Sequence, residues 1–329
     1  MTNRERFKKV LNFEQVDRLP VVEWACWWTQ TLDRWHGEGL PDDLDHDGLY
    51  NFFGLDMHEQ YWLYPLRPTC PPPAGHGVGL IKNREEYLTF KEHLYPDEPF
   101  DVELVKKWAK MQEAGETAIW LSFDGFFWYP RRLFGIEPHF YAFYDQPDLM
   151  KEMNEDLLAF NLRALDQFCE IAIPDFMTFG EDMSYNHGPM LSESQFEEFM
   201  APYYRRIVPG LKERGIVTFV DTDGDVTIPV KWFESVGVEG VLPLERMAGV
   251  DIVEIRKNHP NLRMIGAFDK TVMHLGEERM RQEFERIFPV MQQGGFIPGC
   301  DHQTPPGVSM EDYYLYLRLL REYAEKAVS

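Results

Sequence analysis

Cysteine is scarce in this chain, and the spacing of the few cysteines excludes two classes of site. The four are Cys26, Cys70, Cys169 and Cys300, and no two of them form a CxxC pair. Disulfide scaffolds and zinc knuckles both depend on closely spaced cysteines. The sequence therefore indicates neither a disulfide framework nor a zinc knuckle.

Positive charge and long apolar runs are also lacking. Lys and Arg total 33 against 55 Asp and Glu, a net charge of -22, so nucleic acid and anionic membrane surfaces are not expected partners. No segment approaches the ~18 uninterrupted apolar residues of a membrane span. The opening segment, MTNRERFKKVLNFEQVDRLP, has no apolar stretch of the kind found in signal peptides, and we expect a cytoplasmic location.

The chain does contain a recurring alternation of short apolar runs with longer amphipathic stretches, which is typical of parallel α/β folds. We predict one domain over residues 1–329, a (β/α)₈ TIM barrel. Its expected strands are Leu19–Glu23, Leu55–Met57, Ile119–Asp124, Phe176–Glu181, Ile216–Asp221, Gly240–Leu242, Arg263–Phe268 and Gly295–Cys300.

Four helices are predicted from apolar spacing and capping signals. Ser192 and Gln195 form a capping-box pattern, Pro289 is a candidate kink, and Pro65–Gly79 is expected to be a surface loop. The expected helices are Asp148–Cys169, Ser192–Arg214, Glu277–Gln293 and Ser309–Lys326.

Acidic residues follow many of the expected strands. In a (β/α)₈ barrel the reactive groups lie where strands end, and paired carboxylates there serve as a general acid or base or bind a cation. The acidic residues at these ends, with neighbouring polar residues, are Glu23, Asp56, Asp124, Glu181, Asp182, Asp221, Asp223, Asp225, Glu245, Asp269, Lys270, Cys300, Asp301 and His302.

The segment Val220–Asp225 is the sharpest local pattern, because three aspartates alternate as a strand meets a glycine. A spacing of two places Asp221 and Asp223 on the same side of an extended chain, where they can share a ligand or a proton. We predict that both are catalytic. Asp225 has an alternative role as an Asx-turn residue that caps the next helix.

Two more catalytic candidates follow other strands. His302 is predicted to act as a metal ligand, an acid or base, or a hydrogen-bond donor, and the alternative is a loop histidine. Cys300 is a candidate thiolate ligand or a packed thiol. Glu181 is the other predicted catalytic residue.

Aromatic residues near the same ends predict a wall for an apolar or flat substrate, although about half of these rings are expected to be core residues. The long loop after the first expected strand contains four tryptophans, Trp24, Trp27, Trp28 and Trp35. The predicted substrate-binding residues are Trp24, Trp28, Asp124, Phe127, Tyr129 and Tyr185.

Several segments together resemble the uroporphyrinogen decarboxylase superfamily, which also contains cobalamin-dependent methyltransferases. They are NRERFKKVLNFEQVDRLPV, FGEDMSYNHGPMLSESQFEEFMAPYYRRIV, GAFDK at Gly266–Lys270 and GGFIPGCDHQTPPGVSMEDY. The resemblance covers nearly the whole chain and implies the same (β/α)₈ barrel.

The resemblance also implies which residues to compare between branches. The decarboxylases have an arginine-rich segment after the first strand, where this chain has Glu23–Trp28, and its negative charge opposes a polyanionic tetrapyrrole. The methyltransferases bind zinc through His-x-Cys and a late cysteine. Those positions fall here on Asp221, Asp223 and Cys300, with His302 as a substitute. Such carboxylate ligands would make a Zn²⁺ a stronger Lewis acid that suits a thiol acceptor poorly.

We therefore predict a methyltransferase that moves a methyl group between a small methylated substrate and the corrinoid of a partner protein, with Zn²⁺ or another divalent metal at Asp221, Asp223, His302 and Cys300. One alternative is a decarboxylase of a porphyrinogen or another carboxylated substrate. A second is a non-catalytic protein that binds a corrinoid or tetrapyrrole. A homodimer stays open as the assembly state.

Overall fold

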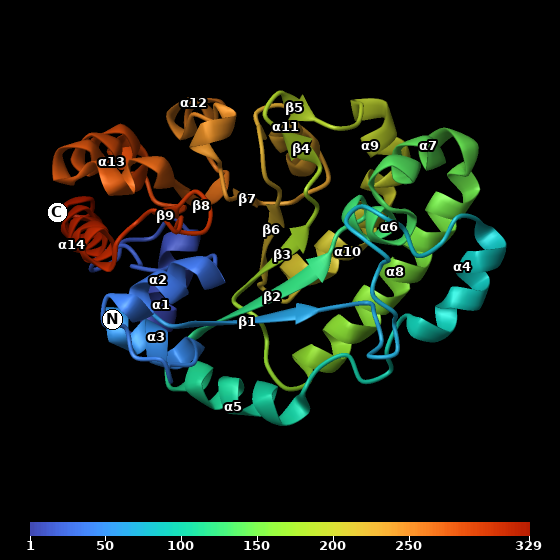
Figure 1. Ribbon diagram of the computed structural model, residues 1–329, viewed down its shortest axis with the longest axis horizontal. Helices are drawn as coiled ribbons and strands as arrows, with labels where there is room; N and C mark the ends of the chain where they lie inside the picture. The colour runs from blue at the N-terminus through green and yellow to red at the C-terminus, as the bar shows by residue number, and fades with distance from the viewer.

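A curled parallel sheet surrounded by helices forms the centre of the molecule (Figure 1). The computed structural model describes all residues from Met1 to Ser329. The sheet has the order β1-β2-β3-β6-β7-β8-β9, and a separate two-stranded hairpin pairs β4 with β5. The strands are β1 (His58–Leu63), β2 (Ala118–Asp124), β3 (Phe176–Gly180), β4 (Ser184–Tyr185), β5 (Gly188–Pro189), β6 (Val217–Asp221), β7 (Gly240–Leu242), β8 (Arg263–Phe268) and β9 (Phe296–Cys300).

Fourteen α-helices cover the sheet, and none of them is long and apolar enough to cross a membrane. They are α1 (Asn3–Leu11), α2 (Thr29–Gly37), α3 (His46–Phe53), α4 (Arg84–Phe90), α5 (Val102–Glu113), α6 (Trp128–Phe134), α7 (Ile136–Asp145), α8 (Pro147–Cys169), α9 (Glu193–Phe199), α10 (Ala201–Glu213), α11 (Pro229–Ser235), α12 (Ile252–Asn258), α13 (Glu277–Met291) and α14 (Met310–Lys326). Short 3₁₀ turns occupy Lys91–His93, Arg246–Ala248 and Lys270–Leu275.

The predicted parallel α/β class is confirmed, whereas the sheet has seven strands and not the predicted eight. Leu19–Glu23 is not a strand. Pro20 has no N–H, and the N–H of Val21 bonds the Asp56 side chain at 2.8 Å, so the segment lacks a regular ladder. It still lies between the two outer strands, because Val21 accepts from the Asp56 N–H and Trp24 donates to the Cys300 carbonyl.

The second predicted strand, Leu55–Met57, is also misplaced, because β1 begins one residue later and continues to Leu63. The six remaining predictions agree with β2, β3, β6, β7, β8 and β9 to within two residues. These six strands are almost entirely buried, as apolar runs of a parallel sheet should be.

The predicted helix Ser192–Arg214 is wrong in one respect, because it divides into α9 and α10 at Met200. Pro202 is the second residue of α10 and lacks a backbone N–H, so a continuous helix loses a hydrogen bond there. The capping box of Ser192 and Gln195 is confirmed, as are the helices at α8, α13 and α14. The loop Pro65–Gly79 contains no helix or strand, as predicted.

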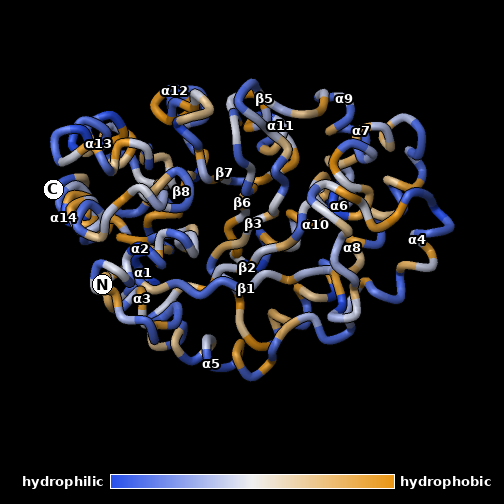
Figure 2. Tube along the Cα trace, viewed as in Figure 1, coloured by the Kyte–Doolittle hydropathy of each residue, from blue (hydrophilic) through white to orange (hydrophobic).

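The two ends of the chain pack against the same side of the sheet. Trp35 of α2 lies 4.7 Å, between ring centroids, from Tyr313 of α14, and Trp27 also contacts Tyr313. Helices α2, α13 and α14 therefore form one wall (Figure 1). Along the trace, hydrophobic residues alternate with hydrophilic ones in most helices, as amphipathic helices on a sheet require (Figure 2).

Candidate functional site

The inner face of the sheet changes from apolar to polar along β2, β3 and β6. Trp120 stacks on Phe176 with ring centroids 5.3 Å apart, and two residues later the Ser122 and Thr178 hydroxyls lie 2.8 Å apart. Another step of two reaches Asp124, because side chains on one face of a strand repeat every second residue. The aromatic layer thus closes one end of the curl, and acidic groups occupy the other.

Strand register brings those acidic groups together. Asp124 pairs with Gly180 between β2 and β3, and Gly180 pairs with Asp221 between β3 and β6. The pairing continues past β3, because the N–H of Glu181 donates to the Asp221 carbonyl at 2.8 Å. The carboxyl ends of three strands therefore present their acids at one place.

A cavity of about 340 Å³ opens at this place, and we call it the acid cavity. Gly180 forms part of its wall, and a Cβ there would lie 2.9 Å from the Trp62 ring, so only glycine lets Trp62 pack this closely. The residues that line the acid cavity are Trp62, Tyr64, Asp124, Trp128, Arg132, Gly180, Asp182 and Asp221.

Among the acidic residues of this cavity, Asp124 is the one that forms an ion pair with a basic side chain. Its carboxylate forms an ion pair with Arg132 and accepts a hydrogen bond from the Trp62 indole at 3.2 Å. Burial raises the pKa of Asp124, while Arg132 and Trp62 oppose the rise. Arg132 also lies over the Tyr64 ring at 5.4 Å, so the pair positions two aromatic rings of the wall.

Asp221 lacks such a partner. Burial raises the pKa of Asp221 well above its ordinary range, and the charges of Asp182 and Asp223 raise it further. Asp182 adopts a φ of 41°, which turns the chain sharply after β3, and burial raises its pKa as well. Burial and the neighbouring carboxylates therefore favour the protonated form of Asp221, which faces a cavity.

A second polar group, beside the acid cavity, contains Asp223 and His302. The His302 imidazole lies 3.7 Å from the Asp223 carboxylate, and Lys270 lies 3.4 Å from Glu245 and 3.9 Å from Asp301. Burial raises the pKa of Asp223 to about 7. Burial and Lys270 lower the pKa of His302, so its imidazole is neutral at pH 7.

Glu181 is buried beneath the site and has a full set of donors. The backbone N–H groups of Phe126, Phe127 and Trp128 donate to it at 2.9, 2.7 and 3.1 Å, and Tyr204 donates from its hydroxyl. Burial raises its pKa to about 7. Its carboxylate holds the turn that follows β2 and does not line the acid cavity.

The four predicted metal ligands do not assemble into a metal centre in this structure. Cys300 is fully buried, and its thiol contacts the Met273 sulfur at 3.6 Å and the Thr304 hydroxyl at 3.9 Å. Asp221, Asp223, His302 and Cys300 include no three residues with ligand atoms all within 4.8 Å of one another. This donor set therefore does not fit a zinc ion in the arrangement that the structure shows.

The predicted aromatic residues occupy different surroundings. Phe127 and Tyr129 are fully buried in the core, where Phe127 packs on His139 and Tyr129 donates to the Tyr95 hydroxyl. Trp24 is buried with its edge toward His302, at 6.1 Å between ring centroids. Trp28 precedes α2 and is exposed.

Tyr185 lies on the β4–β5 hairpin, beside the turn that follows Asp223. Its carbonyl accepts from the Asp225 N–H at 2.9 Å, and its ring is half exposed. The hairpin therefore borders the acidic turn, although Tyr185 does not line the acid cavity.

Trp62, Tyr64 and Arg132 line the acid cavity but were not predicted as site residues. Trp62 belongs to β1, a strand that was placed too early in the sequence, and Tyr64 directly follows that strand. The alternation within His58–Tyr64 gives the missing signal, because Trp62 falls on the same face as His58. Arg132 lies one turn into α6, where only the fold brings it to Asp124.

A larger cavity of about 730 Å³ adjoins the acid cavity, with Trp128 and Arg132 in the walls of both, and we call it the arginine cavity. The proline-rich loop predicted as a surface element forms much of it. Arg67, Arg131 and Arg132 are its charged residues, together with His76. Burial lowers the pKa of Arg131, which donates to the Asp182 carbonyl at 3.0 Å.

The sequence of this α/β chain matches a known family profile. The profile is that of uroporphyrinogen decarboxylase, and it matches residues 135–323, more than half of the chain. The chain belongs to the uroporphyrinogen decarboxylase family. The predicted resemblance is thereby confirmed, while no curated protein sequence matches this family member.

Solved structures with a similar fold are much more distant in sequence from this uroporphyrinogen decarboxylase family member. A methyltransferase from Methanosarcina mazei has a TM-score of 0.66 and 14% identity, with 98% of each chain covered. A B12-independent methionine synthase from Shewanella sp. W3-18-1 has a TM-score of 0.48 and 13% identity, with 94% of this chain and 93% of that chain covered. The first similarity shows a shared fold, whereas the TM-score of the second is too low to show one.

Proposed function

We propose that the protein is a methyltransferase that removes a methyl group from a small ether or amine. The observation that carries the proposal is the uncompensated Asp221 carboxyl in the wall of the acid cavity. Family membership and the fold shared with the Methanosarcina mazei methyltransferase support it.

In the proposed reaction Asp221 is the general acid. The bond between the methyl carbon and the substrate heteroatom breaks, and the heteroatom keeps the electron pair and takes the Asp221 proton. The methyl carbon bonds to a nucleophilic acceptor, for which we propose the corrinoid of a partner protein. A general acid of this kind typically contributes about 10² to 10⁴ in rate.

The other residues of the acid cavity hold the substrate. Trp62, Tyr64 and Trp128 provide an apolar wall for the methyl group and its carbon skeleton. Asp182 keeps Asp221 protonated, because two nearby carboxylates resist ionising together. We propose a supporting role for Glu181, which fixes the turn that carries Trp128, and a role for Asp223 and His302 in proton exchange with solvent.

A methyl-transfer assay tests this proposal. The purified protein is mixed with cob(I)alamin as the acceptor and with a panel of methylamines and methyl ethers, and the absorbance of methylcobalamin is followed. We expect enzyme-dependent methylcobalamin with at least one donor. Absence of methylcobalamin with every donor, from protein shown to be folded, would contradict the proposal.

The arginine cavity favours a second candidate, decarboxylation of a carboxylated substrate. Arg67 and Arg131 attract a carboxylate there, despite the net charge of -22 on the whole chain. A substrate anchored there would extend toward Asp221, which would protonate the carbon that loses carbon dioxide. Release of carbon dioxide from uroporphyrinogen or a simpler carboxylated pyrrole, without methyl transfer, would establish this function in place of the first.

A further inference from the structure

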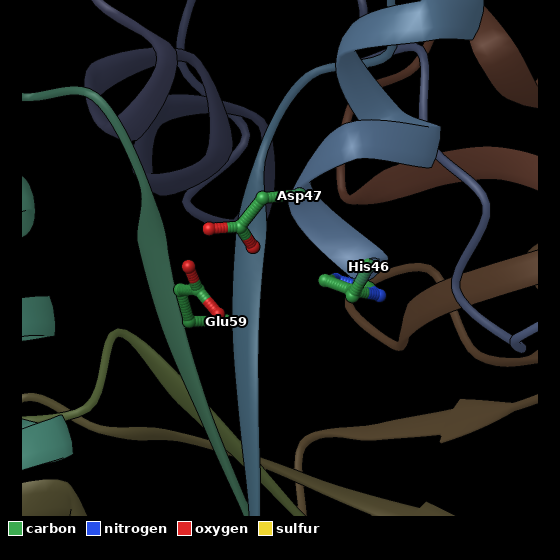
Figure 3. A group of neighbouring side chains, drawn as sticks. All are labelled: His46, Asp47 and Glu59. Carbon is green, nitrogen blue, oxygen red and sulfur yellow. The ribbon is translucent and has the colours of Figure 1, made fainter. Parts of the chain in front are cut away.

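We propose that His46, Asp47 and Glu59 form a binding site for one divalent transition-metal ion on the outside of the sheet. One ligand atom from each residue lies within 4.8 Å of the others, and this is the one such group in the chain. His46 and Asp47 open α3, and Glu59 is the second residue of β1. In Figure 3 the two carboxylates face each other, with the imidazole beside them.

Glu59 provides the observation that calls for a ligand. It is 4% exposed, and its Oε1 atom has no hydrogen-bond partner. A buried carboxylate oxygen without a partner carries an uncompensated desolvation cost. A metal ion bonded to that oxygen would offset the desolvation cost, because it gives the oxygen the partner that the protein does not provide.

The charges around the group also favour a cation. Asp45 and Asp47 are close enough to act on the Glu59 carboxyl, and Lys107 is the cation that opposes them. The Lys107 ammonium lies 3.6 Å from Asp47 and its side chain is 59% exposed, so it can move into solvent when a metal binds. The two carboxylates of Asp45 and Asp47 outnumber the single ammonium of Lys107 around Glu59.

The donor types and the space narrow the choice of ion. One imidazole nitrogen with two carboxylate oxygens suits Zn²⁺, Mn²⁺ or Fe²⁺. Ligand atoms around tetrahedral Zn²⁺ lie roughly 3.4 Å apart, and these lie within 4.8 Å of one another, so the side chains need to close by no more than about 1.4 Å. They border a cavity of about 620 Å³, which leaves room for water or a ligand at the remaining coordination positions.

The three ligands of this site do not line the acid cavity, although Trp62 and Tyr64 lie in the walls of both neighbouring cavities. Successive residues of a strand point to opposite faces, so Glu59 lies on the outer face while Trp62 points to the inner one. The proposal also does not depend on methyl transfer, because its test measures metal binding alone.

Zn²⁺ binding by the full-length protein tests the proposal. Isothermal titration with zinc chloride, followed by elemental analysis after dialysis, should find one equivalent in the wild type. Glu59→Gln and Asp47→Asn should each weaken binding by at least about 10-fold. Asp45→Asn is the matched control: it removes a neighbouring charge but keeps the α3 cap, and should change affinity by only a few-fold.

A second pair of variants distinguishes zinc binding at this site from zinc binding at the carboxyl ends of the strands. Asp221→Asn and Asp223→Asn should keep the zinc stoichiometry of the wild type. No zinc binding by the wild type, or binding retained by Asp47→Asn and Glu59→Gln but lost with Asp221→Asn, would overturn the proposal. The Asp47 side chain is one-third exposed, so we expect Asp47→Asn to fold. Zinc binding by this variant therefore tests the proposal even if Glu59→Gln does not fold.

Discussion

Asp221 and Asp225 are four residues apart, yet their side chains have different surroundings. Asp221 lines the acid cavity without a counter-charge, whereas Asp225 accepts from the Thr227 N–H at 2.9 Å in an Asx turn. The Asx turn that the sequence left open for Asp225 is thus present, but Asp225 does not cap the next helix, whose N-cap is Ile228. The two residues form a matched pair for mutation.

Asp221→Asn should lower kcat by about 10² to 10⁴, because the amide cannot release a proton to the leaving group. Asp225→Asn should leave kcat within about 3-fold, since Asn also forms Asx turns. In the wild type the rate should fall as the pH rises through the raised pKa of Asp221, because only the protonated acid works. Steady-state kinetics with the donor found by the methyl-transfer assay measure the kcat of both variants and the pH dependence of the wild type. Equal losses of kcat in Asp221→Asn and Asp225→Asn would refute the assignment of Asp221 as the general acid.

Gly125 is the residue that allows Glu181 to reach the turn after β2. A Cβ at Gly125 would lie 2.1 Å from the Glu181 carboxyl carbon, while a Cβ at Gly37 would meet nothing within 4 Å. Gly125→Ala should therefore lower the free energy of unfolding by about 1 to 3 kcal/mol. Gly37→Ala in α2 should be neutral or slightly stabilising. Urea denaturation compares the two, and a neutral Gly125→Ala would show that Glu181 is not held as described.

At the scale of elements, the gap between β1 and β9 depends on a side chain. Asp56 pairs with Arg18 at 2.5 Å and accepts from the Val21 N–H, so it anchors the segment that fills the place of an eighth strand. Asp56→Ala should cost about 2 to 4 kcal/mol, since it leaves partly buried donors without a partner. Asp97→Ala, which removes an exposed ion pair with Arg67, should cost less than about 1 kcal/mol.

Chemical denaturation of both variants checks this account of the gap. Similar small losses would mean that the packing of the N-terminal segment, and not Asp56, holds it in place. A large loss only for Asp56→Ala agrees with the hydrogen bonds described.

Much of the sheet was predictable because buried parallel strands are continuous apolar runs, as in β2, β3, β6 and β8. The first strand was not, because Pro20 and the Asp56 side chain interrupt a ladder that the residues alone favour. The acid cavity was predictable in part. Spacing indicated Asp221, whereas the place of Arg132 beside Asp124 depends on how α6 follows its strand. Spacing likewise could not show that Cys300 points into the core.

At the scale of the whole molecule, buried carboxyls should make stability fall with rising pH. Burial raises the pKa of Glu23 to about 8 and that of Asp301 to about 6, both above their values in an unfolded chain. These two carboxyls then hold more protons in the folded protein than in the unfolded one between about pH 4 and 8, so their contribution to the free energy of unfolding decreases across that window. Below about pH 6.5 the buried imidazoles of His58 and His139, whose pKa burial lowers to about 3, act in the opposite direction. Asp17 has a pKa lowered to about 2 by Arg6, and its effect appears only in strong acid.

Thermal unfolding between pH 5 and 8 measures this trend. We expect Tm to fall as the pH rises, with a total loss on the order of a few kcal/mol. Glu23→Gln, which cannot ionise, should show a shallower decline than the wild type. A Tm that rises steadily over the same range would contradict the raised pKa values.

We propose that Asp221 holds its proton at neutral pH in the wall of the acid cavity, and infrared spectroscopy tests this without knowledge of the substrate. The measurement is the difference spectrum between the wild type and Asp221→Asn at pH 7. A protonated Asp221 should give a carboxylic-acid C=O band in the wild type that Asp221→Asn lacks. A difference spectrum that contains only ionised carboxylate bands would contradict it.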